Sequence, residues 1–267
     1  MGAWPGCGDF SFLAAIMNSN VIRLIVFVCI FGSALLGMVI RAALPEGHLS
    51  AESKDSVRLG IGMIATMAAL VLGLLVASAK SFYDAQSSEL TQLSANVILL
   101  DRVLAHYGPE TKEVRELLRG AVARTLDLMW HQDHQQNSKM TPTAAGGEIL
   151  YDKIQALSPT NDAQRTLQAQ ASSMAVDLGK LRWLMFEQGS SSVSLPLLAV
   201  LVFWLAIVFT SFGLFAPPNA TVISTLFLCA LSVSGGIFLI LEMYTPFQGL
   251  MQISSAPLRE ALAHLGQ

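Results

Sequence analysis

The stretch VASAKSFYDAQ, residues 76–86, joins a long apolar run to a polar, helix-favouring sequence. It contains no Gly, no Pro and no cluster of turn residues, so nothing in it ends a helix. The preceding run, Leu59 to Ala79, carries no charge and has about the 20 residues that a helix needs to cross the hydrocarbon core of a membrane. The stretch therefore predicts a helix that begins in a bilayer and continues beyond it.

Three further apolar runs of similar length indicate a multi-pass membrane protein. Val21 to Ile40 holds one charge, Arg23, while Leu195 to Ala216 and Ala220 to Leu241 hold none. Hydrophobic residues make up 53% of the chain and charged residues 13%, which is about half the charged fraction of soluble domains. We expect four transmembrane helices in two hairpins, the second of which turns at the tight sequence APPN.

The positive charges lie mostly between the two hairpins. Of the 16 Lys and Arg residues, 11 fall between Lys80 and Ser194, against three between Arg41 and Arg58. Because Lys and Arg accumulate on the cytoplasmic side of membrane ends, we expect both termini and the central segment in the cytoplasm. The predicted domains are an N-terminal tail with helices one and two at 1–79, a cytoplasmic helical insert at 80–194, helices three and four at 195–243, and a cytoplasmic C-terminal segment at 244–267.

The insert between the hairpins has the apolar spacing of amphipathic helices. Steps of three and four residues join Leu93, Val97, Leu100 and Leu104, and YGPE at 107–110 ends this helix at Gly108. Further helical faces are expected at 114–126, 149–157 and 167–185, with a polar loop at 135–147. No segment alternates with period two over a useful length, so the predicted fold is all-α.

The second apolar run and the first insert helix have no proline between them. Leu59 to Tyr107 covers 49 residues, or about 73 Å of continuous helix at 1.5 Å per residue. About 30 Å of it would lie in hydrocarbon and the rest would project into the cytoplasm. The alternative is a hinge at Ser78 to Ser81, since small residues and serines often mark bends.

Four ionisable side chains are expected at the cytoplasmic mouth of the membrane helices: Arg23, Lys80, Asp84 and Glu242. Ionisable groups at membrane depth tend to mark ion or substrate paths, and snorkelling at the interface is the alternative. The second apolar run is also rich in Gly and Ala. Small residues of this kind suit either close packing of helices or a pore constriction.

The motifs of common enzyme classes and cofactor sites are absent from the sequence. It contains no P-loop, GxSxG, H-E-x-x-H or CxxC arrangement, so we expect neither an enzyme nor a cofactor. His131 and His134, with Asp133 beside them, have no evident third ligand, and a polar helix end explains them better than a metal site. A net charge of −3 without a basic stripe argues against a nucleic-acid partner.

Two segments of the sequence resemble the bacterial bestrophin-like family of membrane proteins. They are AKSFYDAQSSELTQLSANVILLDRVLAHYGPE at 79–110, which contains Asp101 and Arg102, and EMYTPFQGLMQISSAPLREAL at 242–262. The second segment has the pattern E-x-x-x-P-F-x-G, with Pro246, Phe247 and Gly249. This pattern is similar to the acidic residue and the Pro-Phe-Gly element of the bestrophins.

The resemblance implies a homo-oligomeric channel in the bacterial inner membrane, pentameric and conducting small inorganic anions. Bestrophins line their pore with the second helix of each subunit. The matching face here is formed by Thr66, Leu70, Gly73 and Ala77. The alternative is a non-conducting sensor or scaffold, whose subunits would meet through insert faces such as Leu93, Val97 and Leu100.

Overall fold

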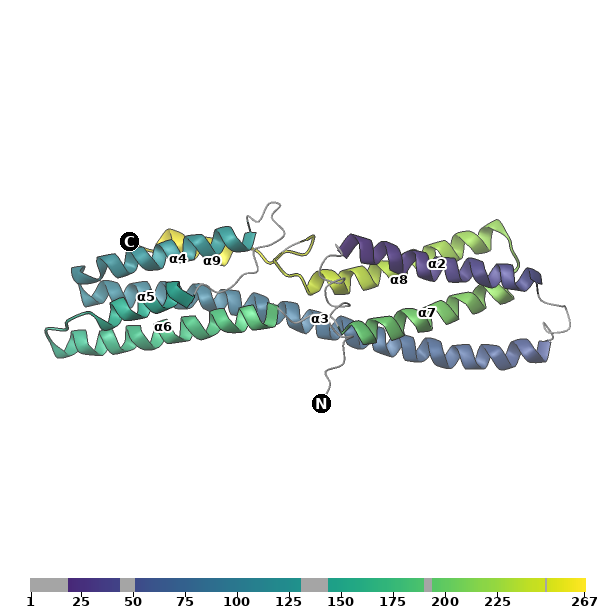
Figure 1. Ribbon diagram of the computed structural model, residues 1–267, viewed down its shortest axis with the longest axis horizontal. Helices are drawn as coiled ribbons and strands as arrows, with labels where there is room; N and C mark the ends of the chain where they lie inside the picture. The colour runs from purple at the N-terminus through teal and green to yellow at the C-terminus, as the bar shows by residue number, and fades with distance from the viewer. Residues whose placement is uncertain (1–18, 44–50, 131–143, 190–193, 248) are drawn as a thin grey trace, which may run out of the picture. The chain divides into compact units, whose positions relative to one another are not determined.

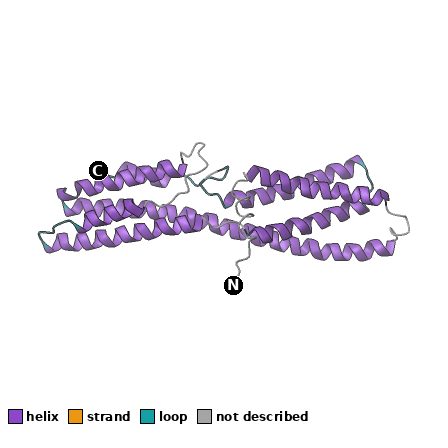
Figure 2. Ribbon diagram, viewed as in Figure 1, coloured by secondary structure: helices purple, strands orange, loops and turns teal. Residues whose placement is uncertain are grey.

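The computed structural model describes residues 19–43, 51–130, 144–189, 194–247 and 249–267. These residues are helical or form short connections, and Figure 2 shows no strand among them. The chain divides into two compact units, the first drawn from residues 1–81 and 192–244 and the second from 82–191 and 245–267. The all-α prediction is confirmed.

Figure 1 shows the order of the helices along the chain. Their bounds are α2 (Ser19–Ala43), α3 (Ala51–Tyr107), the 3-10 turn η2 (Pro109–Thr111), α4 (Lys112–Trp130), α5 (Ala144–Gln155), α6 (Asp162–Gly189), α7 (Leu195–Phe215), α8 (Ala220–Met243) and α9 (Ala256–His264).

The first unit contains α2, α7, α8 and the first part of α3. These four helices are long and apolar enough to cross a membrane, as the sequence predicts. Their shared core includes Ile30 of α2, Leu201 of α7 and Ile237 of α8, all fully buried. Many other apolar side chains point outward, as expected for helices in lipid, and Leu24 and Leu228 are each at least 60% exposed.

Two glycines let α2 and α7 approach closely. A Cβ atom added to Gly37 would collide with the backbone of Thr210, and one added to Gly213 would collide with the carbonyl of Ala34. Close approach at small residues is a main source of helix association in lipid. In α3, by contrast, a Cβ on Gly60 or Gly73 would meet no atom within 4 Å. Within one chain, therefore, close approach is made by α2 and α7, and these glycines of α3 do not serve it.

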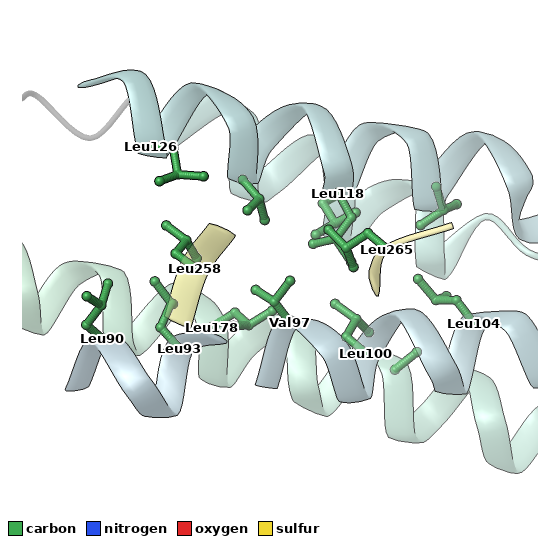
Figure 3. Close-up of a cluster of buried hydrophobic side chains, with 14 of the residues drawn as sticks. Leu90, Leu93, Val97, Leu100, Leu104, Leu118, Leu126, Leu178, Leu258 and Leu265 are labelled. Carbon is green, nitrogen blue, oxygen red and sulfur yellow. The ribbon is translucent and has the colours of Figure 1, made fainter. Parts of the chain in front are cut away.

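The second unit contains the rest of α3 with α4, α5, α6 and α9 around one apolar core. Figure 3 shows Leu118 and Leu126 of α4 facing the leucines of α3, with Leu258 of α9 between them. The buried side of α3 is formed by Leu93, Val97, Leu100 and Leu104, the residues whose spacing predicts an amphipathic helix. Because these side chains pack inside their own chain, they do not form the contacts between subunits that the scaffold hypothesis assigns to them.

The turn between α3 and α4 lies where the sequence YGPE predicts it. Gly108 has φ 139°, a conformation that side-chain-bearing residues rarely adopt. The buried hydroxyl of Thr111 donates to the carbonyl oxygen of Leu104 at 2.6 Å and also lies 2.8 Å from that of Gly108. The bond to Leu104 satisfies a carbonyl group at the end of α3 that has no partner within the helix.

Helix α5 begins earlier than the sequence predicts. The loop expected at 135–147 extends into residues that are helical from Ala144, so Gly146 and Gly147 lie in the first turns of α5. Gly disfavours helix, but most helical stability in a protein comes from packing of the apolar face. Leu150 and Ile154 provide that packing, since both are buried in the core of the second unit.

Helix α3 runs through residues 76–86 without interruption. It contains 57 residues, which corresponds to about 85 Å at 1.5 Å per residue. Every residue from Ser78 to Ser81 is helical, so the helix does not break at the alternative hinge position. The apolar run and the first insert helix thus form one element.

Candidate functional site

The residues predicted to line a pore share one uncovered face of α3. Thr66, Leu70, Gly73 and Ala77 are all exposed, with Leu70 at 70%. Steps of four, three and four residues place them on one side of the helix. The opposite side carries Ala68, which is buried in the core of the first unit. The face is apolar apart from the Thr66 hydroxyl, which donates to the carbonyl oxygen of Gly62 at 2.8 Å.

Three of the predicted charged positions, Arg23, Lys80 and Glu242, belong to the first unit. The guanidinium of Arg23, near the start of α2, lies over the Phe238 ring of α8, 4.9 Å from its centroid. Glu242, at the end of α8, is buried at 5% exposure, whereas Lys80 is exposed. The carboxylate of Asp84 belongs to the second unit.

A hydrogen bond ties α3 to the residue that follows α8. The hydroxyl groups of Ser78 and Tyr244 lie 3.2 Å apart, and either can donate. These residues are each two positions from a predicted charge, Lys80 and Glu242 respectively. Sequence reasoning missed Ser78, Tyr244 and Phe238 as parts of the site, because a hydroxyl or a ring in an apolar run gives no signal of its partner.

Asp101, which the resemblance singles out, forms a buried two-point ion pair with Arg115 of α4. Arg115 Nε donates to Asp101 Oδ1 at 2.7 Å, and a terminal guanidinium nitrogen donates to Oδ2 at 2.8 Å. The Asp101 side chain is 1% exposed. The hydrogen bond with Asp101 raises the pKa of Arg115 above its usual value, against the opposing effect of burial. The Arg115 guanidinium therefore stays charged, and the pair joins α3 to α4.

The same pair holds the residues that follow α9. The Gly266 N–H donates to Asp101 Oδ2 at 3.4 Å, and Arg115 donates to the backbone oxygen of Gln267 at 3.2 Å. Arg102, the neighbour of Asp101 in the quoted segment, reaches the same Gln267 oxygen at 3.5 Å. Asp101 and Arg102 thus fasten the residues after α9 to α3, which is a structural task.

The segment with Pro246, Phe247 and Gly249 forms a turn held by Trp130. The buried Pro246 accepts a hydrogen bond from the Ile253 N–H at 2.7 Å, and Gly249 has φ 84°. The Phe247 ring meets the Trp130 ring edge to face, with centroids 5.5 Å apart. The Trp130 indole N–H also donates to the carbonyl oxygen of Ile253 at 3.0 Å. Trp130 gave no signal in the sequence beyond its position at a helix end.

The possible metal ligands His131, Asp133 and His134 lie outside the described residues. In the part of the chain that the structure describes, no three His, Cys, Asp or Glu side chains gather as a metal site would require.

The chain matches a known protein family. The family model of the bestrophin-like domain matches residues 28–258, a span from α2 to α9 that includes Lys80, Glu242, the Asp101 ion pair and the Pro246 turn. No curated protein matches the chain. Since the matched region covers most of its length, the chain belongs to the bestrophin-like family.

Proposed function

We propose that the protein is an oligomeric ion channel, in which α3 of each subunit lines the pore and small inorganic anions pass. Family membership supports a channel-like function. The observation that carries the proposal is the face of α3 with Thr66, Leu70, Gly73 and Ala77, which no other part of the described chain covers. Several copies around a central axis would turn this face into a lining, and the resemblance to bestrophins favours five.

The chemistry of this face suits a gated pore. Leu70 is its bulkiest side chain, and a ring of leucines would form an apolar constriction that closes by losing water. Gly73 and Ala77 widen the path toward Lys80, whose positive charge would raise the local concentration of anions. The family resemblance favours the bacterial inner membrane, and the Lys and Arg of the insert favour cytoplasmic termini.

The test is electrical recording of the purified, full-length protein in planar bilayers under a chloride gradient. The reversal potential should lie close to that of chloride, and Lys80→Glu should move it toward that of the cation. Leu70→Ala should increase the current at a given voltage, because it widens the apolar constriction.

Leu228→Ala is the matched control, since Leu228 is similarly exposed but lies on α8. It should leave the current unchanged. A folded oligomer that stays silent at every voltage would contradict the proposal, as would identical currents from Leu70→Ala and Leu228→Ala.

The alternative function, a non-conducting sensor or scaffold, has less support. Its proposed contact face of Leu93, Val97 and Leu100 is occupied by the core of the second unit. The same recordings separate the two functions, because a scaffold would carry no current in any variant.

A further inference from the structure

A cleft of about 320 Å³ opens in the second unit, with α5 and α6 as its walls. Its apolar floor comes from three other helices: Leu93 and Val97 of α3, Leu118 of α4 and Leu258 of α9. Small-molecule sites have volumes of roughly 300–1,000 Å³ and linings that are mostly apolar with a few polar groups. The cleft thus has the size and the floor of a site for a small apolar group.

The wall formed by α5 carries two carboxylates. Glu148 and Asp152 both line the cleft and lie four residues apart, so they occupy one side of the helix. Among the described residues, neither side chain forms an ion pair. Arg182 of α6 also lines the cleft and brings one positive charge to it. With two carboxylates against one guanidinium, the lining has a net negative charge.

Aromatic side chains stand on both walls of the cleft. Tyr151 of α5 lies between the two acidic positions, and Trp183 of α6 is 51% exposed. The face of an aromatic ring attracts cations, most strongly for Trp, and quaternary ammonium groups are often recognised in this way. Carboxylates and rings here favour the same kind of ligand.

We propose that this cleft binds a small amphipathic cation of the alkylammonium class. The alkyl part would lie on the leucine and valine floor, and the ammonium group would lie between the α5 carboxylates and the rings of Tyr151 and Trp183. An amphipathic anion would meet the two carboxylates, and a neutral apolar molecule would leave them unused. The proposal concerns the second unit alone and stands whether or not the protein conducts ions.

The test uses the full-length protein in lipid nanodiscs and hexyltrimethylammonium as the probe. Isothermal titration calorimetry, with empty nanodiscs subtracted, should show saturable binding of one probe per chain. Hexanoate and hexanol, which have the same chain length, should bind at least tenfold more weakly.

Two sets of variants locate the site. Glu148→Gln with Asp152→Asn should weaken probe binding at least tenfold. Glu116→Gln with Glu260→Gln is the control, because it changes the net charge equally at exposed positions that do not line the cleft. It should leave the affinity unchanged.

Gly179→Leu provides a second, steric test. Gly179 lines the cleft, and a Cβ there would meet no atom within 4 Å, so a side chain at this position begins in open space. The variant should keep its helical circular dichroism and its Tm but lose binding of the probe. Equal binding of cation, anion and alcohol, or full binding by both the charge-neutral and the Gly179→Leu variants, would overturn the proposal.

Discussion

At the scale of single residues, the Asp101–Arg115 pair illustrates what a buried charge requires. Taking two charges out of water is costly, and a two-point contact with short hydrogen bonds offsets that cost. Removing one partner leaves the other charged and without compensation. The raised pKa of Arg115 means that its contribution to stability is present throughout the neutral range and is lost only as the pH rises through that pKa.

We expect Asp101→Asn to lower the free energy of unfolding by about 3 kcal/mol, since it breaks a buried ion pair. Thermal unfolding of the purified protein, followed by circular dichroism, measures the change. Glu113→Gln is the control, because Glu113 pairs with Lys153 at 2.7 Å but is 67% exposed, and it should cost less than about 1 kcal/mol. Equal losses for the two variants would show that burial does not set the value of the Asp101 pair.

The sequence indicates which faces of the helices are buried, but it leaves their partners undetermined. The spacing of Leu93, Val97 and Leu100 predicts a buried face because helical geometry alone fixes it. Only the family resemblance marks Asp101 as a candidate site residue. Its partner cannot be predicted from the sequence, because α4 carries other arginines besides Arg115. Pairings such as Trp130 with Phe247 depend on how distant segments pack, and local periodicity carries no information on that.

At the scale of helices, the contact between α2 and α7 depends on glycine at two positions. Gly37 and Gly213 each lie against the backbone of the opposite helix, and a backbone cannot move aside as a flexible side chain can. The apolar runs predict both helices and cannot predict this contact, because Gly and Ala are spread through the other membrane helices as well.

Gly37→Ala and Gly213→Ala should each destabilise the protein by about 1–3 kcal/mol, the usual cost of overpacking. Thermal unfolding in a mild detergent measures the loss. Gly60→Ala is the matched control on α3, where the added Cβ meets no atom, and it should be neutral or slightly stabilising because Ala favours helix. A loss at Gly60 equal to that at Gly37 would contradict the role of close approach.

The continuity of α3 makes a further prediction at this scale. Amide hydrogens of residues 76–86 should exchange as slowly as those of 93–104, because helical hydrogen bonds run through both stretches. Hydrogen exchange with mass spectrometry on the full-length protein measures both rates. Fast exchange confined to 78–81 would instead favour the hinge.

At the scale of the whole molecule, a pore requires several chains, so its test must report on the assembly. In a variant without its native cysteines, Ala77→Cys should react with a charged, water-soluble thiol reagent, because the proposed pore brings water to that face. A cysteine retained only at 229, exposed on α8, should react slowly, because lipid surrounds it. Mass spectrometry of the labelled protein measures both. Slow labelling at both positions would contradict a water-filled path along α3.

Because α3 is unbroken, the number of residues between its two buried segments also matters. Leu75 and Leu90 are buried in the cores of the first and second units, and they lie 15 positions apart, so each marks an apolar stripe of the same uninterrupted helix. A loop absorbs an insertion, but a helix converts each added residue into a rotation of about 100° and a rise of about 1.5 Å. One alanine inserted after Ser81 would therefore put the two stripes out of phase, and seven would almost restore them. In this part of α3, the number of residues is constrained as well as their identity.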